Sequence, residues 1–186
     1  RDLVVACWDE EENGLVGSRA YADRAKERGD PIAAALVLEM IGFKSDAEGS
    51  QELPAGLDLI FPDQAAWLTR HKNKGDFVAY IADDSARAAS AALEAQSAVI
   101  GLPAIVLELA QSMKSSGAVH DLRRSDHDSF WKNGFPAVMI TDTSEFRNKR
   151  YHCTGGQDSV DTLDPGFTAA IVRATTAAAA VVLCLK

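Results

Sequence analysis

The sequence predicts one α/β domain over residues 1–186, a three-layer sandwich with a mostly parallel sheet covered by helices on both faces. Three observations lead to this prediction. Apolar runs of strand length alternate along the chain with segments of helical character. Several of these runs are apolar throughout, which is typical of strands buried on both faces. The length of 186 residues suits a single domain with one sizeable core.

The first part of the chain predicts two strands, a helix and a long loop. Residues 3–8, LVVACW, predict a buried strand. Residues 14–27 predict a helix that Gly29-Asp30-Pro31 ends. Residues 32–41 fit a helix or a buried strand by periodicity, and the following Gly42 favours strand in the C-terminal half. Residues 44–71 predict a loop, in which Phe61 and Trp67 are candidate walls of a pocket or anchors onto the core.

The second part predicts three strands and three helices. The strands are residues 76–82, 104–109 and 136–141, and residues 112–124 and 144–164 predict connecting loops. The helices are residues 85–97 with Ser85 as N-cap, 125–133 closed by Gly134, and 165–183 with Pro165 near the first turn. In such folds ligands bind at the carboxyl ends of strands, so acids and histidines there are the candidate site residues.

Composition and charge exclude several classes of function. The formal net charge of −8 makes nucleic acid an improbable partner. No apolar run approaches the length of a membrane span, and the C-terminal TTAAAAVVLCLK predicts an ordinary helix. The three cysteines match no zinc-ribbon or CxxC spacing, so they are reduced or at most one pair forms. The sequence also lacks a G-x-S-x-G elbow, a phosphate loop, an HExxH motif and a dinucleotide fingerprint.

The remaining candidates for site residues are carboxylates and histidine. Glu11 and Glu12 follow the first predicted strand and point to opposite sides of it, so one of them can face a metal and the other a substrate. The alternative is a solvated acidic turn at the start of a helix. Glu39 lies in the apolar run VLEMIGF, where a buried carboxylate is costly unless it is paired or coordinated. His152 lies in a loop ahead of the last predicted helix, and such ligands suit Zn²⁺ or Mn²⁺.

Four ordered segments resemble the co-catalytic di-zinc aminopeptidases, whose fold glutaminyl cyclases share. The segments are WDEEENGLVGS, VLEMIGF, SDHDSFWKNGFPAVMITDT, and FRNKRYHC continuing to DSVDTLD. The resemblance implies that Glu11 is the general base, Glu12 and His152 bind one metal, and Glu39 binds the other. It also implies that Asp126 and His127 support the site and orient the substrate. His71 and His120 match no motif, and we expect both of them to be surface residues.

Two departures from the family pattern affect these assignments. Gly155-Gly156 lengthens the interval after His152, and Cys153 beside His152 is a soft ligand that could compete for metal. The family also has an earlier His and a metal-bridging Asp, and neither is found here because the chain begins at the strand that carries Glu11. We therefore expect an N-terminally truncated member with an incomplete site for two Zn²⁺ ions and with weak or no activity. Its open sheet edge would favour pairing with another chain.

The resemblance implies a metal-dependent exopeptidase that acts on peptide substrates. Two alternatives remain: a non-catalytic interaction module on the same fold, and a glutaminyl cyclase with one zinc. The VLEMIGF segment, and FRN ahead of the histidine, favour a peptidase. Relatives of this type are often secreted or periplasmic, which is an expectation from the family alone.

Overall fold

A four-stranded sheet is the middle layer of the computed structural model, which describes residues 2–114 and 116–184. Its strands are β1 (Ala35–Glu39), β2 (Val78–Asp83), β3 (Ala104–Leu109) and β4 (Ala137–Thr141), in the order β1-β4-β2-β3. The pairs β1–β4 and β2–β3 are parallel, and β2–β4 is antiparallel. The carboxyl ends of β1 and β4 therefore lie at the same end of the sheet as the starts of β2 and β3.

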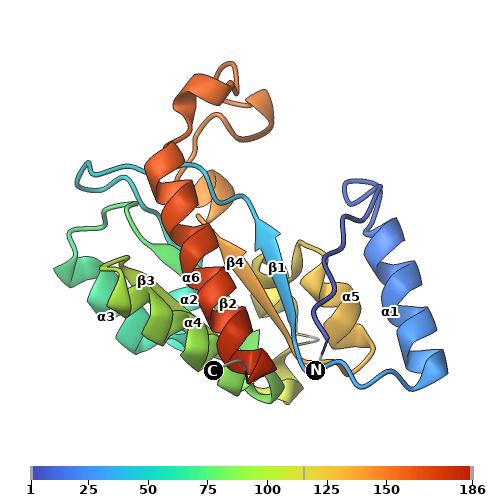
Figure 1. Ribbon diagram of the computed structural model, residues 1–186. Coiled ribbons are helices and arrows are strands. Elements are labelled where there is room, and N and C mark those ends of the chain that lie inside the picture. Colours follow the sequence, from blue (N-terminus) through green and yellow to red (C-terminus); the bar gives the residue numbers. More distant parts are fainter. Residues whose placement is uncertain (1, 115, 185–186) are drawn as a thin grey trace.

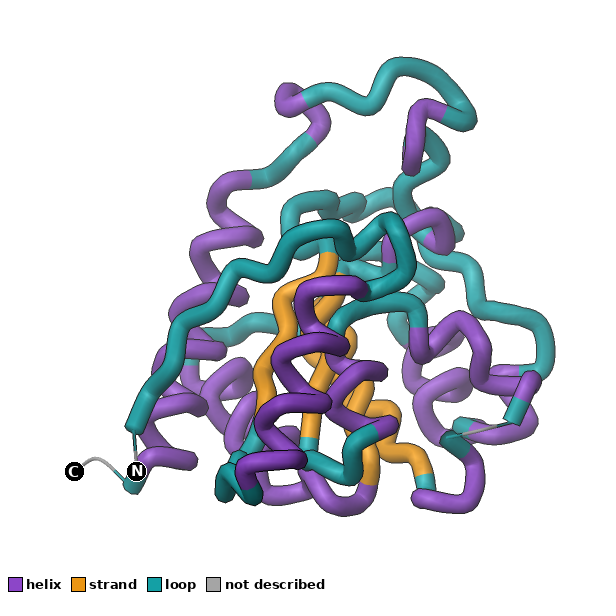
Figure 2. Tube along the Cα trace, turned by 90° about the vertical axis from the view of Figure 1, so that its right-hand side faces the viewer, coloured by secondary structure: helices purple, strands orange, loops and turns teal. Residues whose placement is uncertain are grey.

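Helices cover both faces of this sheet, as the sequence predicts (Figures 1 and 2). On one face α4 (Arg87–Val99) and α6 (Pro165–Leu183) pack against the alternate residues Val78, Tyr80 and Ala82 of β2. The opposite face carries α1 (Val16–Arg28), α2 (Leu57–Ile60), α3 (Pro62–Arg70) and α5 (His127–Lys132). Short 3₁₀ turns connect these elements: Asp84–Ala86, Gln111–Met113, Gly117–Arg123, Ser144–Phe146, Tyr151–Cys153 and Val160–Thr162.

The last helix begins where the sequence predicts. The Asp164 carboxylate accepts a hydrogen bond from the backbone N–H of Phe167 at 2.9 Å, and Pro165 lies in the first turn. By length and composition alone, α6 is the one helix of the described residues that could cross a membrane. A core helix passes the same test, and α6 buries Phe167, Ile171 and Ala174 against α4 and the sheet.

The predicted strand at residues 3–8 is wrong. These residues lie outside every strand of the described sheet, and Leu3, Val4 and Val5 are 64, 66 and 86% exposed. Only Trp8 is anchored, with its ring 5.4 Å from that of Phe130. An apolar β-branched run becomes a strand only where a neighbouring strand supplies hydrogen-bond partners, and no described strand pairs with this one.

The predicted loop at residues 44–71 is wrong in its second half, because α2 and α3 lie there. Leu57, Phe61 and Leu68 are buried at a spacing close to helical turns, and the Gly and Pro residues around them hide this period in the sequence. His71, predicted as a surface residue, is half-buried: its Nε2 lies 2.6 Å from the Asp76 carboxylate. His120 is exposed, as predicted.

Two helix starts also differ from prediction. The Asp83 carboxylate, and not Ser85, accepts the hydrogen bond from the backbone N–H of Ala86 ahead of α4. The helix predicted over residues 125–133 is shorter, His127–Lys132, and Gly134 follows its end with φ +80°, as expected of a residue that closes a helix. The three cysteines are unpaired and exposed.

Candidate active site

A tight turn ahead of α1 carries Glu11 and Glu12. The backbone N–H of Leu15 donates to the carbonyl of Glu11 at 2.8 Å, and the N–H of Gly17 donates to that of Asp9 at 3.1 Å. A Cβ at Gly17 would lie 2.7 Å from the Asp9 carboxylate, so only glycine lets the acidic turn approach α1 this closely. Gly17, the second glycine of the segment WDEEENGLVGS, therefore has a packing reason.

The edge strand β1 supplies the third acid. Glu39 is the last residue of this strand, opposite Thr141 of β4, and its side chain is half-buried. The hydroxyl of Ser125, in the turn ahead of α5, donates to Glu39 Oε2 at 2.7 Å. This bond fixes one carboxylate oxygen of Glu39 and leaves the other for a second partner.

The long segment between β4 and α6 supplies His152. In Figure 1 this segment, in orange, rises above the sheet. The His152 ring stacks on that of Tyr151 at 4.0 Å, and its Nε2 lies 3.3 Å from Glu12 Oε1. A Cβ at Gly155 would lie 2.2 Å from the carbonyl oxygen of Lys149, so the extra glycines let this segment fold back on itself.

One hollow of ≈ 240 Å³ brings four of the predicted residues together: it is lined by Glu11, Glu12, Glu39 and His152. Four further residues complete its wall: Met40, Arg124, Tyr151 and Asp158. None of these four was predicted as a site residue, although Met40 and Tyr151 lie within the motifs and Arg124 directly precedes Ser125. The hollow lies at the carboxyl end of β1, where folds of this type bind their ligands.

Asp126 and His127, the two predicted site residues of the S-D-H segment, lie in different environments. Asp126 is close enough for its negative charge to raise the pKa of Glu11 and Glu39, and its Oδ1 is buried without a hydrogen-bond partner. His127 is fully buried, donates from Nε2 to the carbonyl of Leu122 at 2.9 Å, and packs edge-on against Trp131. The structure thus brings Asp126 toward the hollow and places His127 in the core.

Negative charge gathered in the hollow changes its acid–base chemistry. Burial, followed by the charges of Glu39, Glu12 and Asp126, raises the pKa of Glu11 to about 7. Burial also raises the pKa of Glu39, against the lowering effect of the Ser125 hydrogen bond. A cation bound in the hollow would offset this repulsion and would lower the pKa of both carboxyls again.

The donors in the hollow suit zinc in kind but do not complete a site. Carboxylate oxygen and imidazole nitrogen are common zinc ligands, and Glu12 and His152 lie next to each other. Across residues 2–114 and 116–184, however, no three His, Cys, Asp or Glu side chains converge closely enough to hold a metal ion. The chain therefore presents an adjacent pair of donors, with Glu39 on the same hollow.

The molecule thus combines a three-layer α/β fold with an acidic, histidine-bearing hollow at a strand end. The chain belongs to peptidase family M28, whose family model matches residues 1–179. The uncharacterized protein YfbL of Escherichia coli (strain K12) is 31% identical over 135 residues, which cover 72% of this chain and 36% of that protein.

Two solved aminopeptidases have a similar fold. LapA of Legionella pneumophila aligns with a TM-score of 0.57 at 17% identity, over 96% of this chain and 38% of its own. The aminopeptidase of Aneurinibacillus sp. strain AM-1 aligns with a TM-score of 0.58 at 17% identity, over 93% of this chain and 31% of its own. The chain thus spans about a third of the length of these relatives.

Proposed function

We propose that this chain is the part of a metal-dependent aminopeptidase that carries its general base and three of its metal ligands. The observation that carries the proposal is the meeting of Glu11, Glu12, Glu39 and His152 on one hollow in a member of a peptidase family. They come from three separate segments of the sequence and are the ones that the motifs predict. The reaction would release N-terminal residues from peptides by attack of water on the first peptide bond.

Each residue has a distinct role in this proposal. Glu12 and His152 would bind one zinc ion, and Glu39, held by Ser125, would bind a second. Bound zinc supplies Lewis-acid chemistry and lowers the pKa of water. Glu11 would accept the proton of the attacking water and pass it to the leaving amine. Asp126, with its unpartnered Oδ1, would support the cationic centre.

We further propose that the remaining ligands belong to polypeptide outside this sequence. Catalytic zinc usually has three protein ligands, whereas the described residues offer an adjacent pair and one further carboxylate. The partial coverage of the aminopeptidases, 38 and 31% of their chains, is consistent with this proposal. The chain by itself would then bind zinc weakly and turn over little peptide.

Zinc stoichiometry tests the proposal. We expect at most one weakly held zinc in this chain, and two in a version that is extended upstream in the gene. Glu12→Gln should abolish binding to this chain, and so should His152→Ala. Glu10→Gln is the matched control, because it removes the same charge from an exposed residue beside the motif. Absence of zinc from both versions would contradict the peptidase proposal and favour a non-catalytic module on this fold.

A further inference from the structure

A buried aspartate lies between the two chain segments that carry Glu39 and His152. Asp142 is 1% exposed and directly follows β4, the strand that pairs with β1 as far as Glu39 itself. It stands behind the acidic hollow, by which we mean the hollow that Glu11, Glu12, Glu39 and His152 line. Burying a carboxylate is costly unless it has partners, so the partners of Asp142 indicate what its charge is for.

On one side, Asp142 holds the turn that follows Glu39. Its Oδ2 accepts hydrogen bonds from the backbone N–H groups of Gly42 at 3.0 Å and Phe43 at 2.7 Å. Its own backbone N–H donates to the carbonyl of Met40, the residue next to Glu39, at 2.7 Å. These three bonds fix the backbone directly after Glu39, and with it the direction from which the Glu39 carboxylate enters the acidic hollow.

On the other side, Asp142 holds the start of the segment that carries His152. Its Oδ1 accepts a hydrogen bond from the backbone N–H of Ser144 at 3.0 Å. The carbonyl of Ser144 accepts from the N–H of Asn148 at 2.7 Å, and the carbonyl of Asn148 accepts from the N–H of Tyr151 at 3.1 Å. The Asp142 carboxylate therefore begins a chain of hydrogen bonds that ends beside His152.

Three residues around Asp142 have a left-handed backbone conformation, although none of them is glycine. The φ angle is +44° at Met40, +77° at Thr143 and +50° at Ser144. Residues with a Cβ rarely adopt this region, and they persist there only where the surrounding structure fixes them. Met40 and Ser144 are hydrogen-bond partners of Asp142, and Thr143 follows it and donates from Oγ1 to Gln51 at 3.0 Å. Strain of this kind gathers at functional sites.

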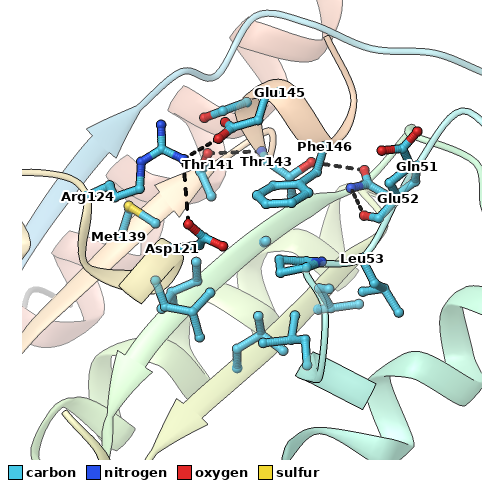
Figure 3. A pocket seen from close by; sticks show the side chains of 18 of the residues that line it. Gln51, Glu52, Leu53, Asp121, Arg124, Met139, Thr141, Thr143, Glu145 and Phe146 are labelled. Carbon is cyan, nitrogen blue, oxygen red and sulfur yellow. Dashed lines mark hydrogen bonds and ion pairs between the residues drawn. The ribbon is translucent and has the colours of Figure 1, made fainter. Parts of the chain in front are cut away.

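The segment that follows Asp142 also contacts the acidic hollow through a second route. Glu145, the residue after Ser144, forms an ion pair with Arg124 (Figure 3). Arg124 lines the acidic hollow. A shift of the backbone at Ser144 would therefore reach the hollow through Arg124 as well as through His152.

We propose that Asp142 is a positioning residue that sets the placement of Glu39 relative to His152. This inference rests on the proposed metal-dependent function, in which both of these side chains are metal ligands. Donor groups bind a metal ion tightly when the fold already holds them at the right separation, because no rearrangement is then needed on binding. Asp142 provides this through the backbone of the two segments that it joins.

The variant Asp142→Asn tests this role with little change of shape. Its amide has a single acceptor oxygen, and the orientation that keeps two hydrogen bonds directs this oxygen at Gly42 and Phe43. The NH₂ group then faces the N–H of Ser144, and that bond is lost. In zinc titrations of this chain and of the version extended upstream in the gene, we expect the affinity of Asp142→Asn to be roughly 10–100-fold below that of the wild type.

A second substitution, Ser144→Gly, separates positioning from charge. Asp142→Asn also removes a negative charge near the acidic hollow, and this alone would weaken the binding of a cation. Glycine adopts a positive φ without strain, so Ser144 no longer needs the bond to Asp142 once it is replaced. The double variant Asp142→Asn, Ser144→Gly should therefore recover most of the lost zinc affinity, although the charge is still missing. Ser144→Gly alone should bind zinc as the wild type does.

The variant Tyr80→Phe is the control for a loss of stability. Tyr80 is fully buried, and its hydroxyl lies 2.6 Å from Ser97 Oγ, between β2 and α4. The variant loses one buried hydrogen bond on the face of the sheet that α4 covers, so it should lower the urea midpoint of unfolding and keep the zinc affinity. A loss of zinc affinity in Tyr80→Phe as large as that in Asp142→Asn would trace both to stability and overturn the positioning role.

Amide hydrogen exchange tests the bonds of Asp142 in the absence of metal. In Asp142→Asn, the amide of Ser144 should exchange faster than in the wild type, whereas the amides of Gly42 and Phe43 should keep their protection. In Tyr80→Phe, all three amides should exchange as in the wild type, once exchange through global unfolding is subtracted. Unchanged exchange at Ser144 in Asp142→Asn would overturn the route from Asp142 to the segment of His152.

The zinc titrations distinguish a failure of this inference from a failure of the proposed function. If the wild type binds zinc and Asp142→Asn binds it equally well, the positioning role is overturned and the peptidase proposal stands. If the double variant binds zinc as weakly as Asp142→Asn, the loss comes from charge, and the positioning role is again overturned alone. If neither version of the wild type binds zinc, the peptidase proposal fails, and a role for Asp142 in placing metal ligands fails with it.

Discussion

At the scale of single residues, the environment decides which acids and histidines can serve a site. Glu10 and Glu11 are neighbours, yet Glu10 is exposed, whereas Glu11 lines the acidic hollow with a pKa raised to about 7 by burial. His127 and His152 differ in the same way: His127 is buried in the core, and His152 faces Glu12. The residue types in a motif therefore indicate which residues are candidates for the site. Only their packing in the fold shows which of these candidates reach it.

We predict that Glu11→Gln removes catalysis and spares metal binding. Glutamine keeps the shape of the side chain but cannot accept the proton of the attacking water. In the shortest version of the protein that hydrolyses a peptide, the variant should lose about 10²–10⁴-fold in kcat at an unchanged zinc content. Parallel kinetics and zinc analysis would check this. Loss of zinc together with activity would instead make Glu11 a ligand.

The burial of His127 leads us to predict that the stability of the fold depends on pH. Its Nδ1 is buried without a hydrogen-bond partner, and burial lowers the pKa of the imidazole from 6.5 to about 4. The unfolded chain therefore binds a proton below pH ~6.5 that the folded chain excludes until about pH 4. The stability contributed by the neutral ring is complete above this window and is lost as the pH falls through it, by up to about 3 kcal/mol.

Urea unfolding at about pH 7.5 and about pH 5 would measure this effect. His127→Leu should flatten the dependence of the unfolding free energy on pH, although loss of the bond to Leu122 lowers stability at both values. His120→Leu, at an exposed position, should keep the wild-type slope. An unaltered slope in His127→Leu would assign the pH dependence to other groups.

The sequence predicted the candidate site better than its surroundings. Glu11, Glu12, Glu39 and His152 were found because each stands in a short motif next to a glycine or an apolar run. Arg124 and Glu145 were not found, because a lone Arg and a lone Glu in loops give no sign that they form a pair at a pocket. Their ion pair joins residues 21 positions apart in the sequence. The hydrophobic periodicity of a sequence carries no information about such a tertiary contact.

At the scale of elements, strands and long helices were predicted where apolar periodicity is strong. The strands β2, β3 and β4 and the helix α6 lie within two residues of their predicted bounds. The failures have a different origin. A strand depends on its neighbours, so residues 3–8 could not be judged locally, and the short helices α2 and α3 contain too few turns for a clear apolar period.

The start of α4 gives a prediction at this scale. Asp83 is fully buried, accepts from the Ala86 N–H and the Ser85 hydroxyl, and pairs with Lys114, whose side chain is 12% exposed. Asp83→Asn should lower the unfolding free energy by about 3–5 kcal/mol, because Lys114 would remain buried without a counter-charge. Ser85→Ala should cost no more than about 1 kcal/mol. Urea unfolding of both variants would check this, and a larger loss in Ser85→Ala would return the capping role to Ser85.

At the scale of the whole molecule, the sheet has an exposed apolar edge. Among the described strands β1 is the edge strand on the side of the acidic hollow, and its Leu38 is 49% exposed. Residues 3–5 add three exposed apolar side chains. Open strand edges and exposed β-branched runs are the features through which sheets join other chains. The exposed apolar edge and the acidic hollow therefore lie on the same side of the sheet.

We predict that this chain self-associates as its concentration rises, and that a charge in the exposed run opposes it. Val5→Lys places a cation in the run at a side chain that is 86% exposed, so it should lower the weight-average mass in light scattering with little change in the unfolding midpoint. Val160→Lys, at an 83% exposed position between β4 and α6, is the matched control and should associate as the wild type does. A monomeric wild-type chain at all concentrations would contradict the prediction. Equal relief by both variants would trace the association to net charge, because each adds one positive charge to an acidic protein.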